Sequence, residues 1–418
     1  MDARLISAWI PTTAVVIALV GLIGEGADRR PSEPPADIAP ALVVDGARDA
    51  DPVDLATGLY TRTSDDFLVL DTVPIRFARV YVSGDTRALP FGIGTTHSYD
   101  SFMTGDLSAI TVITDERSRI AYIRVDGGTG RDGARYEHRT TASRFQGSIL
   151  SWAGDRWRLA FSDGSAWLYR SCRTQANPNG RCTLIGQQSP AGDQVSLVRD
   201  DLGRLVRMET PNGRWVRLEY DEVNRVTRGW DSTGRSMNYE YDASGRLARA
   251  IASTGERQGY EYDAAHRLTR ITERDGVVIT NTYDTAGRTI DQVITFPPEA
   301  PETIPPSPLT FGFRYGTAGT RITDVEVRQP DGGVRRVTLN SAGYILTETR
   351  TTGDGVTMAT TYTRDGATNV VSAVEVACTP PGGETTRARA TIGPRMSAET
   401  VVGVFARRCR MSETDDAL

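Results

Sequence analysis

Apolar and charged residues alternate along short stretches between residues 196 and 295, and turn-forming residues separate these stretches. Segment 215–220, with the sequence WVRLEY, is typical of a strand with one buried face. The turns recur at alternating steps of 10 and 11 residues. That spacing leaves strands of about seven residues, roughly 23 Å long at 3.3 Å per residue. The pattern predicts a continuous antiparallel ribbon of β-hairpins, and therefore an all-β fold.

A Tyr-Asp pair recurs every 21 residues in this stretch and marks it as an internal repeat. Glycine follows the same step midway between the pairs, at positions 213, 234, 255 and 276. Self-similarity at a fixed period of this size is the signature of a repeat architecture. The repeat-defining turn residues are Tyr220, Asp221, Asn224, Arg225, Tyr241, Asp242, Gly245, Arg246, Tyr262, Asp263, His266, Arg267, Tyr283, Asp284, Gly287 and Arg288.

The turn after each Tyr-Asp pair needs a left-handed residue at its fourth position. In the turn 242–245, aspartate comes first and glycine fourth, which is the preference of a type I turn. Asn224 and His266 stand where this glycine is missing. Asn and His are among the few other residues enriched at positive φ. We therefore expect position four to have a positive φ and to begin the return strand.

The best copy of the repeat, Tyr-Asp-Ala-Ser-Gly-Arg-Leu at 241–247, resembles the YD repeat of bacterial Rhs (rearrangement hotspot) proteins. The same repeat is found in teneurins and insecticidal toxin complexes. The resemblance implies a spiralling ribbon that forms part of a hollow β-shell. In the family, long arrays enclose a C-terminal toxin, and an Asp-Pro-x-Gly motif marks self-cleavage at their end. Nothing in this sequence resembles that motif after residue 300.

A second resemblance covers residues 51 to about 110, which look like the β-domain that precedes YD repeats in Rhs-type proteins. The matching stretches are Asp51-Pro52-Val53-Asp54, Thr57-Gly58, 73–81 (VPIRFARVY) and 92–100 (GIGTTHSYD). That family usually has Trp where Thr95 stands and Asn where Val82 stands. These departures indicate a divergent member.

Composition divides the rest of the chain. An apolar run after Arg4 suits an export signal or membrane anchor, and we favour this over a buried helix because nothing else in the sequence reads as helical. The expected organisation is a signal peptide or membrane anchor at 1–27, a Pro-rich tether at 28–50, the β-domain at 51–110, a β region with a small tryptophan core (Trp152, Trp157, Trp167) at 111–195, regular repeats at 196–295, a Pro-rich insertion at 296–309, degenerate repeats at 310–376 and a C-terminal tail at 377–418.

Four cysteines agree with export to an oxidising compartment. Cys172 and Cys182 bracket a polar loop, while Cys378 and Cys409 bracket the C-terminal region. These pairs suit two disulfides, and three connectivities stay open. No C-x-x-C spacing or nearby histidine supports a metal site. We expect a bacterial envelope or secreted protein, which touches a membrane only through its N-terminal segment.

Charge and motifs argue against nucleic-acid binding and catalysis. A formal net charge of -5 does not suit a surface that wraps nucleic acid. His97 stands beside Ser98 and Asp100, but strand neighbours point to opposite faces, so this adjacency is not a triad. The chain has three histidines and no G-x-S-x-G, H-E-x-x-H or P-loop motif. We therefore expect no catalytic residue, no cofactor and no metal.

The arginine of each repeat lies four residues after its aspartate, across one turn, so that the two charges can neutralise each other. We favour this self-compensated ladder over a surface for anionic glycans. The leading functional expectation is a non-enzymatic exported scaffold, shell segment or surface interaction module. One alternative is a polymorphic-toxin precursor with a C-terminal effector, and another is a carbohydrate-binding adhesin. The partners that fit are a cell-surface glycan, an enclosed toxin domain or a further Rhs segment.

Overall fold

The computed structural model describes residues 48–50, 52–141, 143–171, 181–298, 308–393 and 398–411. Across these ranges the chain forms 32 strands and one helix, which confirms the all-β class. The predicted N-terminal signal or anchor and nearly all of the tether lie outside the described residues. No helix in the described ranges is long and apolar enough to cross a bilayer.

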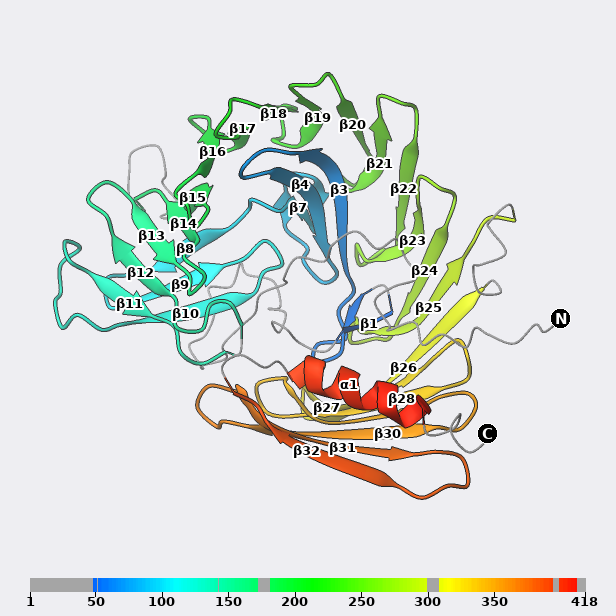
Figure 1. Cartoon of the computed structure of the whole chain (residues 1–418). Helices are drawn as coiled ribbons and strands as arrows, with labels where there is room; N and C mark the ends of the chain where they lie inside the picture. The colour runs from blue at the N-terminus through cyan, green and yellow to red at the C-terminus, as the bar shows by residue number, and fades with distance from the viewer. Residues whose placement is uncertain are drawn as a thin grey trace.

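The first strands form a small domain that we call the inner domain (residues 52–100). A three-stranded antiparallel sheet, in the order β3-β4-β7, forms its centre. In Figure 1 this sheet lies inside the arc of the later strands. The N-terminal strands are β1 (Arg48–Asp49), β2 (Val53–Asp54), β3 (Thr61–Val69), β4 (Ile75–Val82), β5 (Ala88–Leu89), β6 (Gly92–Ile93) and β7 (Thr95–His97).

The next eight strands close on themselves. Strand β15 pairs with β14 and β16, and also with β8 through Cys182↔Met103 and Thr183↔Phe102. Trp157 is buried inside, with Trp152 and Trp167 packed against the same core. The strands are β8 (Phe102–Gly105), β9 (Ala109–Ile113), β10 (Arg119–Arg124), β11 (Arg135–Glu137), β12 (Ile149–Trp152), β13 (Trp157–Ala160), β14 (Ala166–Tyr169) and β15 (Cys182–Gln188).

From β16 onward the chain runs as a ribbon of consecutive hairpins around the inner domain (Figure 1). Each strand buries alternate side chains; in β18, Val216 and Leu218 are buried whereas Arg217 and Glu219 are exposed. The regular part consists of β16 (Gln194–Arg199), β17 (Leu205–Glu209), β18 (Trp215–Tyr220), β19 (Val226–Asp231), β20 (Ser236–Tyr241), β21 (Leu247–Ala252), β22 (Arg257–Tyr262), β23 (Leu268–Thr272), β24 (Val278–Tyr283) and β25 (Thr289–Thr295).

The ribbon continues past the proline-rich insertion, most of which lies outside the described residues. Ile294 in β25 pairs directly with Leu309 in β26, so the ladder passes from one side of the insertion to the other. The later strands are β26 (Leu309–Ala318), β27 (Arg321–Arg328), β28 (Val334–Leu339), β29 (Ile345–Thr351), β30 (Thr357–Arg364), β31 (Val371–Thr379) and β32 (Thr386–Thr391).

The C-terminal region departs from the sequence-based expectation. We expected no helix there and no clear repeat from Thr379 onward, yet β32 and the helix α1 (Ala398–Met411) follow. The helix packs on β31 and β32 and contributes Val401, Val404 and Phe405 to an apolar groove there. These residues recur at helical spacing. The pattern is too short to stand out among alternating strands, which is why it was missed.

Candidate functional site

The Asp and Arg of each repeat form an ion pair across one turn, as the ladder prediction requires. Asp242 accepts hydrogen bonds from the backbone N–H and the Nε of Arg246, at 2.9 and 2.6 Å. The same pairing joins Asp221 to Arg225, Asp263 to Arg267 and Asp284 to Arg288. Burial alone would raise the pKa of the Asp242 carboxyl, but these hydrogen bonds outweigh it and lower that pKa. Each repeat therefore neutralises its own charge.

The Arg of each repeat also stacks on the Tyr of the next one. Arg225 lies 4.3 Å from the centre of the Tyr241 ring, within cation–π range. The hydroxyl of Tyr241 donates to the carbonyl of Val226, which follows that arginine, at 2.5 Å. The same contacts recur from Arg246 to Tyr262 and from Arg267 to Tyr283. The Tyr-Asp-Arg column thus joins successive repeats, and its aromatic faces and hydroxyls are engaged within the protein.

The fourth turn position has the left-handed backbone that the turn chemistry requires. Asn224 and His266 have φ values of 68° and 62°, close to the 80° of Gly245 and the 83° of Gly287. A register shift precedes each Tyr, as between Glu240 and Tyr241, and interrupts the ribbon's own ladder. The backbone groups beside this bulge then need a partner outside the ribbon.

The inner domain supplies that partner at successive YD turns. Its contacts with the turns repeat along the ribbon instead of forming one local patch. They are Val226 N–H to the Pro90 carbonyl at 2.8 Å, Ile93 N–H to the Gly245 carbonyl at 3.3 Å, Leu268 N–H to the Tyr81 hydroxyl at 3.0 Å and Thr289 N–H to the Gly58 carbonyl at 2.8 Å. Four consecutive repeats are therefore held at their turns by one small domain.

Strand β3 crosses the other row of turns, those at the middle of each repeat. Asp71 just past its end accepts a hydrogen bond from the Thr210 hydroxyl at 2.6 Å, and this bond lowers the pKa of Asp71 to about 2. Further along, the Leu68 carbonyl accepts from Arg235 at 2.8 Å. At the strand's start, Arg62 pairs with Glu273 at 2.5 Å. Strand β3 is thus a brace that runs across consecutive hairpins.

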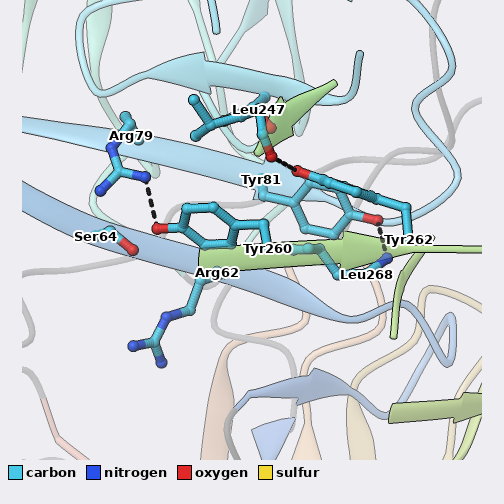
Figure 2. Close-up of a pocket in the computed structure, with 9 residues that line it drawn as sticks. Arg62, Ser64, Arg79, Tyr81, Leu247, Tyr260, Tyr262 and Leu268 are labelled. Carbon is cyan, nitrogen blue, oxygen red and sulfur yellow. Dashed lines mark hydrogen bonds between the residues drawn. The ribbon is translucent and has the colours of Figure 1, made fainter. Parts of the chain in front are cut away.

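A buried charge cluster lies where the inner domain meets the ribbon (Figure 2). Arg79 in β4 pairs with Asp66 in β3 at 2.8 Å, with side chains 3% and 0% exposed. The same guanidinium donates to Tyr260 and Gln258 of the ribbon, each at 2.6 Å, and Asp66 also accepts from the Tyr239 hydroxyl at 2.8 Å. Burial opposes the charge on Arg79, but Asp66 outweighs it and raises the pKa of the guanidinium. Burying the Asp66–Arg79 ion pair without further partners would cost free energy, and the hydrogen bonds with the ribbon offset that cost.

The cavity beside this cluster is too small for a ligand. It holds about 10 Å³ and is bordered by Arg79, Tyr81, Tyr260 and Tyr262 among others. This volume is close to the minimum for one water molecule. Figure 2 shows Tyr260 and Tyr262 directing their hydroxyls at partners within the protein. The inner domain and the ribbon therefore pack tightly against each other at this junction.

The side chains of His97 and its neighbours Ser98 and Asp100 each contact other parts of the protein. His97 is buried against Phe77, and burial lowers its pKa to about 4, so the ring is neutral. The Ser98 hydroxyl donates to the Arg76 carbonyl. Asp100 accepts from Thr96 and Arg117 instead of orienting His97. The described residues contain no cluster of three metal-ligating side chains.

Of the four cysteines, the structure describes the side chains of two. Cys182 and Cys378 are both buried in strands, and neither is a free thiol. The side chains of Cys172 and Cys409 lie outside the described residues. The disulfide connectivity therefore stays a prediction.

Two family models match the chain. One, described as a domain of unknown function (DUF6531), covers residues 50–122 and includes the whole inner domain. The other, the RHS repeat, covers residues 262–293, where the Tyr-Asp-Arg column runs through two successive turns. Residues 262–293 thus carry an RHS repeat, and the chain resembles Rhs-type proteins in this part. No curated protein matches the chain in sequence.

Solved structures of toxin-complex proteins align with this chain at low similarity. TcdB2-TccC3 without its hypervariable C-terminal region is 10% identical, with a TM-score of 0.35, over 76% of this chain and 21% of that one. TcdB2-TccC3 itself is 11% identical, with a TM-score of 0.30, over 84% and 22%. The chain thus spans about a fifth of the length of these proteins.

Proposed function

We propose that this protein is a non-enzymatic, exported scaffold that forms a preassembled segment of a β-shell wall. The observation that carries the proposal is the repeated attachment of the inner domain to the YD turns, with one contact at each of four consecutive repeats. A single-layer ribbon has no second sheet to fix its curvature. The inner domain contacts both rows of turns and can therefore fix the curvature of the ribbon.

The use of the polar side chains supports a structural role. The Asp, Arg and Tyr side chains of the YD column bind one another and the backbone. The charge cluster at Asp66 and Arg79 borders only a water-sized cavity. These groups stabilise the joint between ribbon and inner domain, and they leave no polar cavity there for a substrate.

A growth experiment separates the scaffold from a toxin precursor. The full chain is expressed in a heterologous bacterium, first retained in the cytosol and then directed to the periplasm. A scaffold leaves growth unchanged in both compartments at equal protein level. Growth arrest in either compartment, relieved by a small immunity-type gene from immediately downstream in the native genome, would overturn the scaffold in favour of the toxin precursor.

The carbohydrate-binding adhesin has its own test on the YD column. Glycan-array binding that is lost in Arg246→Ala and Tyr241→Ala would favour it. We expect no such binding, because Arg246 is paired with Asp242 and stacked on Tyr262, while the hydroxyl of Tyr241 binds Val226. Because both substitutions also remove contacts between repeats, any loss must be compared at equal folded fraction, measured by circular dichroism.

A further inference from the structure

The outer face of β17, β18 and β19 carries two tryptophans and three arginines, and the repeat itself does not require the tryptophans or one of the arginines. We call this surface the Trp–Arg patch: Arg207, Trp215, Arg217, Arg228 and Trp230. The opposite face of the same strands packs inward, where Leu218 and Gly229 approach Phe67 of the inner domain. In Figure 1, β17–β19 form the part of the arc that passes outside β3 and β4. The side chains of the patch alternate with the buried ones along these strands, so the patch lies on the face away from the inner domain.

The repeat supplies its own comparison for these positions. One repeat later, 21 residues on, Trp215 is replaced by Ser236, and Trp230 by Ile251. Arg217 is replaced by Asn238. These later strands pair in the same register as the first ones. Neither indole nor the extra arginine is therefore needed to form the ribbon.

Arg217 lies beside a like charge in the ladder. It stands directly opposite Arg207, where like charges are destabilising, and Glu209 offsets this only through its ion pair with Arg207. The equivalent pair one repeat later is Arg228 with Asn238, which carries only one charge. Arg217 thus destabilises the ladder locally, and the ribbon forms without an arginine at this position one repeat later. This combination indicates that Arg217 has a role other than folding.

Arg207 forms an ion pair with Glu209 at 2.9 Å, but the other two arginines of the patch lack the ion pairs seen elsewhere on the same face. Arg249 pairs with Glu240 across the strands at 3.0 Å. At the equivalent place in the patch, Arg228 faces Glu219 in the ladder but lies over the Trp230 ring at 5.4 Å. Arg217 likewise lies over the Trp215 ring at 4.6 Å. Neither Arg217 nor Arg228 forms an ion pair with any residue the structure describes.

We propose that the Trp–Arg patch is a docking surface for an acidic polypeptide segment, presented by a protein partner. Indole rings and guanidinium groups are the side chains most enriched at the energetic centres of protein interfaces. Guanidinium groups held by cation–π contacts keep their N–H edges free for carboxylates, which they bind in bidentate pairs. Because Arg217 and Arg228 have no carboxylate partner in the part of the chain that the structure describes, we expect the partner that docks here to be negatively charged.

The ring geometry favours a polypeptide over a sugar chain. The Trp215 and Trp230 rings are 6.5 Å apart at 87°, in an edge-to-face arrangement. Two perpendicular indoles offer an edge and a face, not one flat platform on which successive sugar rings could stack. Such an edge-and-face pair suits a side chain inserted between neighbouring carboxylates. The inference adds a partner to the proposed scaffold and rests on it.

The test is a titration of the full chain with poly-L-glutamate, followed by intrinsic tryptophan fluorescence and calorimetry. The variant is Trp215→Ser, Arg217→Asn and Trp230→Ile combined, so that each position takes the residue of the next repeat. We expect wild-type binding with a change in indole emission, weakened about tenfold or more in the variant. Arg249→Asn, on the same face but outside the patch, is the matched control and should keep wild-type affinity.

Each outcome decides the matter. Absence of wild-type binding, or equal affinity of the variant, overturns the proposal. Binding of polygalacturonate as tight as that of poly-L-glutamate, with the same loss in the variant, also overturns it, in favour of an anionic glycan. If the triple variant fails to fold, Arg217→Asn alone removes one exposed charge and its contact with the Trp215 ring, leaves the buried face unchanged and still tests the proposal. The growth experiment does not involve this face, so the scaffold and the docking surface can fail separately.

Discussion

At the scale of single residues, the fourth turn position is the strictest requirement of the repeat. The sequence allowed only Gly, Asn or His there, and the structure gives each of them a positive φ. This part of the site was predictable because the constraint is local: it depends on one residue's backbone and not on distant contacts. The same reasoning explains why a histidine stands at position 266, since its turn position accounts for it.

Gly245→Val tests this requirement. The glycine has a φ of 80°, and the only atom near an added Cβ belongs to the flexible Arg225 side chain at 3.6 Å. The cost is therefore backbone strain, about 1–2 kcal/mol for a non-glycine residue in this region. Urea denaturation should show that loss for Gly245→Val and a smaller one for Gly245→Asn. Equal midpoints for Gly245→Val and wild type would count against the turn assignment.

His97 makes stability depend on pH. Burial lowers its pKa to about 4 from 6.5, so between these values the unfolded chain binds more protons than the folded one. Stability must then fall as pH drops from 6.5 towards 4, by at most about 3 kcal/mol. His97→Asn keeps a hydrogen-bond acceptor for the Tyr99 N–H and removes this dependence.

The measurement is the denaturation midpoint of both proteins across that pH range. Asp115 acts in the opposite direction, because burial raises its pKa to about 7, so its contribution is lost as pH rises. Only the difference between wild type and His97→Asn isolates the histidine. A difference that stays constant with pH would show that His97 is solvated and titrates normally.

At the scale of elements, the hairpins were predictable and their attachment was not. Each hairpin is closed by residues within one repeat, so alternation and turn chemistry reveal it. The brace contacts join residues far apart in sequence: Arg62 meets Glu273, and Asp71 meets Thr210. No single-sequence pattern encodes such a pairing. Helix α1 was missed for a different reason, because its apolar spacing spans only a few turns.

Gly92→Ala tests the attachment of the inner domain. A Cβ at Gly92 would lie 2.5 Å from the Gly245 carbonyl oxygen, so the inner domain must move away from that turn. Gly213→Ala is the matched control: its φ of 80° is close to the 89° of Gly92, but nothing lies within 4 Å. Both lose about 1 kcal/mol from backbone strain. Gly92→Ala should lose clearly more in the same denaturation assay, and equal losses would mean that the contact at Gly92 adds nothing.

At the scale of the whole molecule, two buried charge clusters hold the ribbon at different places. One is the Asp66–Arg79 pair under the regular repeats. The other joins the N-terminal strand β1 to the late hairpins: Arg335 in β28 pairs with Asp49 at 2.8 Å and with Glu348 at 3.0 Å, and all three are buried. The ribbon is thus held at two separate places, around β20–β22 and around β28–β29.

If these clusters are separate clamps, breaking each one should loosen a different part of the ribbon. Arg79→Met leaves Asp66 without its main partner, and Arg335→Met leaves Asp49 and Glu348 without theirs. Removing one partner of a buried ion pair costs about 3–5 kcal/mol. Hydrogen exchange should therefore accelerate in β20–β24 for the first variant and in β27–β31 for the second. If either substitution accelerated exchange evenly from β16 to β31, the ribbon would be one cooperative unit and the two-clamp description would be wrong.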